Sequence, residues 1–265
     1  MSENAGLAEE FWMEPSIMAA EYRRRSIVEV PGNVWLHPWP NAFELADAVP
    51  SRHWTLIGGL MVQLHCIAAG VEPPRPTTDV DTLAHVELPG NSLSVLQDGL
   101  AKIRYVPQPS IGYRQSLHRY VRGRDVVDFL VADHAAPSLI RKFPSRGVVR
   151  APGGTNALRR TVEFDIVHQL GTSTISCPDV VGALMLKSEV YRIDSQDSIR
   201  HLKDAVTLSV LLSHSNRGPR MFGSGPKRIR QLIGTLAKHR PEQLGVSVDD
   251  WQDAQIALRD LLEWS

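Results

Sequence analysis

Residues 54–86 read WTLIGGLMVQLHCIAAGVEPPRPTTDVDTLAHV, and this stretch decides how the rest of the chain is interpreted. An apolar run ends at Gly58-Gly59, and apolar residues then recur at helical spacing. The pattern predicts a strand over 54–57, a tight turn, and a helix over 59–69. Amides at a helix N-terminus lack intrahelical partners and lie at the positive end of the helix dipole, so the two glycines are candidate anion ligands.

Two carboxylates, Asp79 and Asp81, open a second expected strand over 79–87. Side chains two residues apart share one face of a strand, so these carboxylates should point the same way and repel each other unless cations lie between them. Asp128 lies among apolar residues in a β-prone run over 125–132, where a charge is costly unless it is paired or bound to a metal. Three carboxylates favour hard divalent cations, and we expect two Mg²⁺ ions here.

These motifs carry a resemblance to a known family. Gly58-Gly59, a helix, Thr78-Asp79-Val80-Asp81 and a later strand aspartate, Asp128, resemble the polymerase-β-type nucleotidyltransferase pattern. The Gly-Gly form, together with Arg75-x-Thr-x-Asp-x-Asp, is similar to the AbiEii-like (MenT-type) nucleotidyltransferase toxins. The second block of that family, a lysine on one helix and an aspartate on the next, resembles PDVVGALMLKSEVY with Lys187 and RHLKDAVTL with Asp204.

The resemblance covers roughly residues 54–210 and implies a fold, a co-substrate and a set of roles. The fold is α+β: a polymerase-β-type nucleotidyltransferase domain with a mixed sheet and helices, followed by a helical C-terminal region. The co-substrate is a nucleoside triphosphate. The implied metal ligands are Asp79, Asp81 and Asp128. The implied catalytic residues are these three together with Lys187 and Asp204. The residues implied to bind the nucleotide are Gly58, Gly59, Arg75, Thr78 and Lys187. The chain departs from the family at Thr207, where a second acidic residue is often found.

Simpler interpretations of the same residues stay open at this stage. Lys187 could be a surface lysine that lays its stem along apolar neighbours. Asp204 could be the exposed helix partner of Arg200, four residues earlier. Arg75 could bind phosphate or pair with the carboxylates. Asp128 has competitors in the acids at either end of its run, but these lie where solvent is accessible.

The composition is that of a globular protein, with 265 residues, 43% hydrophobic and 22% charged. No apolar run reaches the roughly 18 to 20 residues that a membrane span needs. The acidic start of the chain does not resemble a signal peptide, so we expect a cytoplasmic protein without a membrane partner. The two cysteines form neither a disulfide framework nor a zinc spacing.

The order of the patterns predicts the organisation of the chain. We expect an N-terminal arm over 1–53, helical in part over 4–25 and irregular over 26–40, an α/β core over 54–175 and a helical domain over 176–265. A short helix capped by Asn41 is expected in the arm. In the core we expect a helix over 92–103, a hairpin of strands 115–122 and 125–132, and a second hairpin over 147–167 that turns at Pro152-Gly153-Gly154. The helical domain is expected to contain helices over 179–192, 195–213, 226–238 and 248–264. The boundary before the helical region is expected in 170–178.

The net charge of zero hides an asymmetry, because residues 1–133 hold 11 basic and 16 acidic residues and the remainder hold 18 and 13. Two stretches, 134–162 and 205–241, lack acidic residues altogether. Basic stretches suit a polyanion, and with the resemblance they favour RNA, specifically a tRNA 3′ end, as acceptor for a toxin that is paired with an antitoxin. The alternatives are nucleotidyl transfer to a protein or small molecule, and a non-catalytic module that binds nucleotide or nucleic acid.

Overall fold

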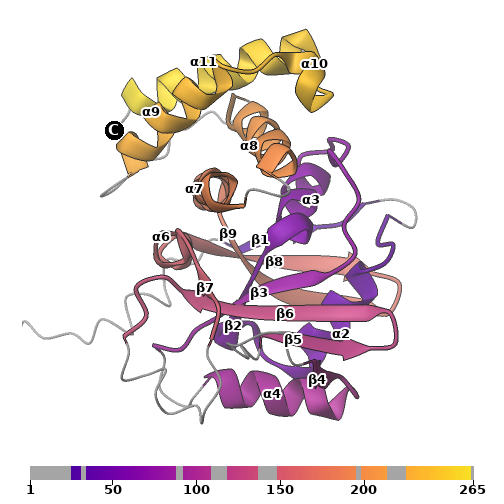
Figure 1. Ribbon diagram of the computed structural model, residues 1–265. Helices are drawn as coiled ribbons and strands as arrows, with labels where there is room; N and C mark the ends of the chain where they lie inside the picture. The colour runs from indigo at the N-terminus through magenta and orange to yellow at the C-terminus, as the bar shows by residue number, and fades with distance from the viewer. Residues whose placement is uncertain are drawn as a thin grey trace, which may run out of the picture.

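The computed structural model describes residues 25–30, 34–87, 92–108, 118–136, 148–194, 198–213 and 225–263. It is an α+β fold in which the described strands form two sheets, each with parallel and antiparallel pairs. Helix α4 lies on one side of the strands and helices α3, α7 and α8 lie on the other (Figure 1). The α+β class with a mixed sheet is therefore confirmed.

The larger sheet positions the acidic residues. Its strand order is β2-β3-β6-β5-β4, with β7 paired to β6. The strands are β2 (Trp54–Ile57), β3 (Val80–Ala84), β4 (Val106–Gln108), β5 (Arg119–Arg122), β6 (Asp125–Ala132) and β7 (Arg150–Ala151). Strands β3 and β6 are parallel and directly paired, so the starts of both strands lie at the same end of the sheet.

The smaller sheet contains β1 (Arg25–Val28), β8 (Thr161–His168) and β9 (Gly171–Pro178) in the order β1-β8-β9. Strand β1 runs parallel to β8, and β8 and β9 form an antiparallel hairpin. The two sheets meet where the Thr55 hydroxyl lies 3.0 Å from the Ser176 hydroxyl in the core. Strand β9 is buried over most of its length, which makes it a central element of the fold.

The helices divide into two groups along the chain. The first group is α2 (Trp39–Ala48), the short 3-10 helix η1 (Ser51–His53), α3 (Gly58–Ala68), α4 (Ser92–Lys102) and α6 (Gly154–Leu158). The second is α7 (Val180–Ile193), α8 (Ser198–Ser213), α9 (Gly225–Leu236), α10 (Pro241–Leu244) and α11 (Val248–Glu263). Helix α3 contacts both α7 and α8, so the first two helices of the second group pack against the helix that follows the glycine turn.

Several expected elements are confirmed. The strand over 54–57 is β2, the following helix begins at Gly58, and the helix expected over 92–103 is α4. Strand β3 is shorter than the expected 79–87. The turn between β5 and β6 sets the register in which Arg122 pairs with Asp125. The four long helices expected after residue 179 correspond to α7, α8, α9 and α11.

The second expected hairpin, over 147–167, is wrong. Gly153 adopts a left-handed backbone conformation with φ +79° and starts helix α6. The Asp133 carboxylate accepts hydrogen bonds from the amides of Gly153 and Thr155, so it holds this turn as a helix start. Strand β8 pairs instead with β9, and segment 170–178, expected as a boundary, contains that buried strand.

The N-terminal expectations are corrected in two places. Asn41 is not a cap, because α2 begins at Trp39 and Asn41 is buried within the helix. Segment 26–40, expected to be irregular, contributes most of strand β1 and two buried tryptophans, Trp35 and Trp39. The helix expected over 4–25 lies, but for its last residue, outside the described residues. Among the helices that are described, none combines the length and apolar character that crossing a membrane requires.

Candidate metal and phosphate site

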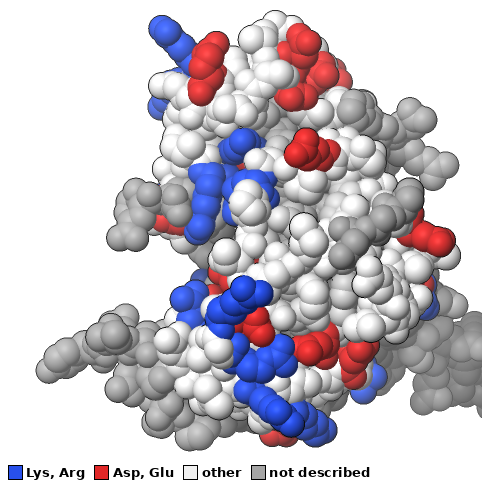
Figure 2. All heavy atoms as spheres, turned by 90° about the vertical axis from the view of Figure 1, so that its right-hand side faces the viewer, with Lys and Arg blue, Asp and Glu red and all other residues white. Residues whose placement is uncertain are grey.

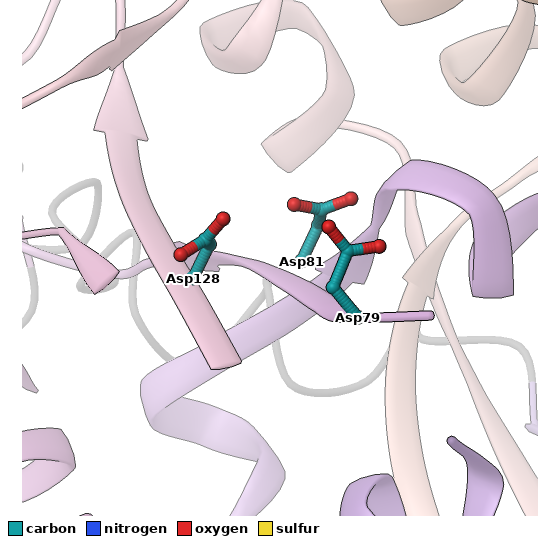
Figure 3. A group of neighbouring side chains, drawn as sticks. All are labelled: Asp79, Asp81 and Asp128. Carbon is teal, nitrogen blue, oxygen red and sulfur yellow. The ribbon is translucent and has the colours of Figure 1, made fainter. Parts of the chain in front are cut away.

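Three carboxylates meet where strand β3 begins to pair with β6. Asp81 stands directly opposite Asp128 in the parallel register, and Asp79 precedes β3 by one residue. One carboxylate oxygen from each residue lies within 4.8 Å of the others. Figure 3 shows all three side chains on the same side of the sheet, two from one strand segment and one from its neighbour. The sequence prediction that these residues converge is confirmed.

All three members of this group are carboxylates, so the group itself contains no positive charge to balance their negative charges. Burial, followed by the charges of Asp79 and Asp128, raises the pKa of Asp81 to about 7. A carboxylate that resists ionisation beside two others will accept either a proton or a cation. Carboxylate oxygens at this spacing are the donor set that a hard divalent cation prefers, so the residues fit Mg²⁺.

Asp128 already has a cationic partner that the sequence reasoning missed. Arg119 donates from Nε to Oδ1 at 2.9 Å and from Nη2 to Oδ2 at 2.6 Å. A usable signal was present, because the turn at 122–125 pairs Arg122 with Asp125 and so brings Arg119 opposite Asp128. The hairpin is predictable from the sequence, and its register places Arg119 beside the acidic residue.

The glycine pair lies directly against the acidic group. Gly58 has φ +70°, and a Cβ atom built on it would lie 1.9 Å from Oδ2 of Asp81. A Cβ atom on Gly59 would lie 2.5 Å from the Thr77 hydroxyl, which itself donates to Oδ1 of Asp79 at 3.1 Å. The pair therefore allows a close approach of the α3 N-terminus to both carboxylates. Thr78, expected to bind nucleotide, is exposed, and its neighbour Thr77 makes the contact to Asp79.

A second charged group lies on the C-terminal helices. Lys187 on α7 places Nζ 2.7 Å from Oδ2 of Asp204 on α8, and the two side chains are only 4% and 1% exposed. Arg75 donates to the same carboxylate from Nε at 3.0 Å and from Nη2 at 2.8 Å. The interpretations of Lys187 as a surface lysine and of Asp204 as an exposed helix partner are therefore wrong.

The pKa values in this group follow from its burial and its pairing. Burial lowers the pKa of Lys187, and contact with Asp204 acts in the opposite direction. Burial disfavours the ionised form of Asp204, but the charges and hydrogen bonds of Lys187 and Arg75 together have a larger effect. The pKa of Asp204 is therefore lowered. Two cations thus share one buried carboxylate, which leaves an excess of positive charge.

The acidic and cationic groups are electrostatic neighbours. The charges of Asp79 and Asp81 help to raise the pKa of Arg75, and Asp81 acts in the same direction on Lys187. The site therefore has a negative side on the sheet and a positive side formed by Lys187 on α7 and Arg75 on the loop before β3. A divalent cation that carries a polyphosphate would match both sides at once.

The two acids that compete with Asp128 have other roles. Asp125 pairs with Arg122 and lies 3.1 Å from His37 Nε2. Asp133 accepts the amides that start α6, as described above. Only Asp128 of this run belongs to the group that could hold a metal among the described residues.

The basic stretches do not build one continuous basic surface in the part of the chain that is described. Arg150 donates to backbone carbonyls, Arg160 pairs with Asp179, and Arg228 pairs with the buried Glu189. The face in Figure 2 carries Lys and Arg side chains beside Asp and Glu side chains. Arg141, Lys142, Arg146, Arg217 and Arg220 lie outside the described residues.

A cavity of about 670 Å³ adjoins the loop that carries Arg75 and Thr77. Its lining includes Trp39, Gln63, and the prolines of the same loop, and most of it is apolar. Gln63 links the two walls, since it accepts from the Trp39 ring nitrogen and donates to the Arg75 carbonyl. A flat, partly apolar group could fit here next to the charged site.

No protein-family model, curated protein or solved structure matches the chain in our comparisons.

Proposed function

We propose that this protein is a metal-dependent nucleotidyltransferase with a polymerase-β-type fold, related to the AbiEii-like toxins. In this reaction an acceptor hydroxyl bonds to the α phosphorus of a nucleoside triphosphate, and the bond to the β phosphate breaks to release pyrophosphate. The observation that carries the proposal is that three convergent carboxylates lie near the group formed by the buried Lys187 and Asp204 and the partly buried Arg75. One side suits divalent cations and the other suits phosphates.

The residues have distinct roles in this proposal. Asp79, Asp81 and Asp128 would hold two Mg²⁺ ions, which when bound supply charge neutralisation and a more acidic acceptor hydroxyl. Lys187, Arg75 and the amides of Gly58 and Gly59 bind the β and γ phosphates and stabilise charge on the departing pyrophosphate. Asp128 also accepts the proton of the attacking hydroxyl.

Asp204 is a positioning residue for both cations. Its two oxygens hold the Arg75 guanidinium in a bidentate pair and orient Lys187 Nζ from α7. A lysine fixed in this way reaches the phosphates without losing side-chain entropy at the moment of binding. The cavity beside Arg75 and Thr77 gives room for the nucleoside part of the substrate.

The acceptor in this proposal is an RNA such as the 3′ end of tRNA, which would make the protein a toxin that an antitoxin controls. Support comes from the motif resemblance and from helix α9, where Lys227 and Arg230 are exposed on one amphipathic segment. Exposed cations along a helix suit a phosphate backbone, and binding of this kind weakens as salt increases.

A second candidate, transfer to a protein or small molecule, is favoured by one observation. Basic and acidic side chains lie beside one another on the face shown in Figure 2, which suits a long polyanion less well than a uniformly basic face. Strong dependence of acceptor binding on salt would favour RNA over this alternative.

The experiment incubates the protein with Mg²⁺, total tRNA and each α-³²P-labelled nucleoside triphosphate in turn. Label on tRNA that disappears in the Asp79→Asn/Asp81→Asn variant supports the proposal and identifies the nucleotide. Asp98→Asn, which changes an exposed acid on α4, is the matched control and should leave labelling intact. Label on protein would favour the second candidate, and nucleotide binding without turnover would favour a non-catalytic module.

A further inference from the structure

Arg119 is a cation built into the acidic side of the site. It lies on β5 at the position that pairs with Asp128 on β6, so the register of the hairpin fixes its backbone beside the carboxylate. Both oxygens of Asp128 accept from the guanidinium, at 2.9 and 2.6 Å. The Asp128 side chain is 8% exposed, whereas that of Arg119 is 42% exposed.

This contact sets up a competition for Asp128. A bidentate guanidinium uses one lone pair on each carboxylate oxygen and places a positive charge where a metal ion bound to those oxygens would lie. A divalent cation and the guanidinium repel each other at this distance, so each weakens the binding of the other to this carboxylate. Asp79 and Asp81 are not held in this way, since Thr77 contributes only a neutral hydroxyl to Asp79.

We propose that Arg119 is the resident counter-ion of Asp128 and controls how many metal ions the site holds. Without nucleotide, the site takes one divalent ion, at Asp79 and Asp81. The second ion binds at Asp128 only after the guanidinium turns away. This inference rests on the proposed function, because the triphosphate is the anion toward which Arg119 would turn.

The exposed side chain of Arg119 can make that exchange. Its backbone is fixed between β4 and β6, but the guanidinium reaches the carboxylate from the solvent side. The planar fork that fits a carboxylate also fits a phosphate in bidentate fashion, so the arginine would exchange one anion for another at little cost. Arg119 would thus link arrival of the triphosphate to completion of the metal site.

The inference is tested by titrating the protein with Mn²⁺ in the absence of nucleotide. Electron paramagnetic resonance and calorimetry measure how many ions bind and how tightly. The wild-type protein should bind one Mn²⁺ per chain. Arg119→Gln should bind two, with the affinity of the first raised on the order of tenfold because a nearby positive charge is removed. Arg119→Lys keeps the positive charge but loses the planar guanidinium, so its affinity for the first Mn²⁺ should lie between those of the wild type and Arg119→Gln.

The matched control is Arg122→Gln, which removes an arginine–carboxylate pair from the same hairpin, at Asp125. It should bind one Mn²⁺ with wild-type affinity, and circular dichroism should show that all variants are folded. Adding a triphosphate with a non-hydrolysable α,β linkage should raise the wild-type count to two. Equal Mn²⁺ number and affinity in wild type and Arg119→Gln would overturn the inference.

Failure of the inference and failure of the proposed function give different results. Two Mn²⁺ ions on the wild-type protein without nucleotide would overturn the role of Arg119 alone. Mn²⁺ binding that is unchanged in Asp79→Asn/Asp81→Asn would overturn the metal site itself, and the inference with it.

Discussion

The Oδ2 atom of Asp81 occupies the space that a side chain on Gly58 would need, because a Cβ atom there would lie 1.9 Å from it. Gly58 also has φ +70°, a conformation that side-chain-bearing residues rarely adopt. Two independent constraints therefore require glycine at the start of α3. One constraint comes from the backbone conformation of the turn and the other from the Asp81 carboxylate, and substitutions can separate the two effects.

Gly58→Ala should lose divalent-metal binding as well as stability, because the new methyl group must displace the Asp81 carboxylate. Gly70→Ala is the matched control, since Gly70 has φ +69° and has no atom within 4 Å of a built Cβ. Both variants should pay about 1 to 2 kcal/mol for the left-handed backbone. Urea denaturation and Mn²⁺ titration of the two would measure this, and equal metal affinity would argue against close packing of Asp81 on the turn.

Loss of Asp204 should destabilise the protein more than loss of Lys187. Asp204→Asn leaves two cations, Lys187 and Arg75, facing each other in a buried place, whereas Lys187→Met leaves a bidentate Arg75–Asp204 pair intact. Breaking a buried pair costs about 3 to 5 kcal/mol, and we expect Asp204→Asn at the upper end.

Denaturant unfolding gives the two free energies directly. Lys203→Ala, on the same helix and partly exposed, should change the free energy of unfolding by less than about 0.5 kcal/mol. A smaller cost for Asp204→Asn than for Lys187→Met would contradict the arrangement of two cations around one carboxylate.

Stabilisation by Mg²⁺ should increase as the pH rises toward neutrality. In the metal-free protein Asp81 keeps its proton up to a pKa of about 7, while the unfolded chain releases it near 3.8. The folded state therefore binds more protons between these values, so the contribution of this group to stability is full below the lower value and is lost as the pH rises through about 7. A divalent ion must displace that proton at lower pH but meets an ionised carboxylate above about 7.

Melting temperatures in Mg²⁺ and in EDTA, measured from about pH 5 to pH 8, check this expectation. The difference between the two conditions should grow with pH and level off above about 7. Asp81→Asn should abolish the difference, and in EDTA at pH 8 it should be more stable than the wild type because one repulsive charge is gone. A Mg²⁺ effect that does not change with pH would speak against Asp81 as a ligand.

The parts of the site that were predictable from sequence are those encoded locally. The glycine turn follows from an apolar run that ends at Gly58, and the shared face of Asp79 and Asp81 follows from strand alternation. Asp128 is predictable because a charge in the middle of an apolar strand needs a partner. The parallel pairing of β3 and β6 then brought all three together.

The parts that were not predictable depend on contacts distant in sequence. Arg75 and Asp204 are 129 residues apart, and no local pattern indicates that they form a bidentate pair. The burial of Lys187 depends on α7 packing among neighbouring elements, so its sequence context suits a surface lysine equally well. The segment 147–167 has the glycines of a hairpin turn, but the Asp133 carboxylate accepts from the amides of Gly153 and Thr155 and so holds the start of a helix.

The most direct test of the central claim compares two labels in one reaction. The protein is incubated with Mg²⁺ and cellular RNA, and with either α-³²P- or γ-³²P-labelled nucleoside triphosphate. We predict that only the α label joins an acceptor, that the γ label leaves as pyrophosphate, and that both events disappear in Asp79→Asn/Asp81→Asn. Transfer of the γ label, or transfer of the α label that survives loss of both carboxylates, would contradict the account.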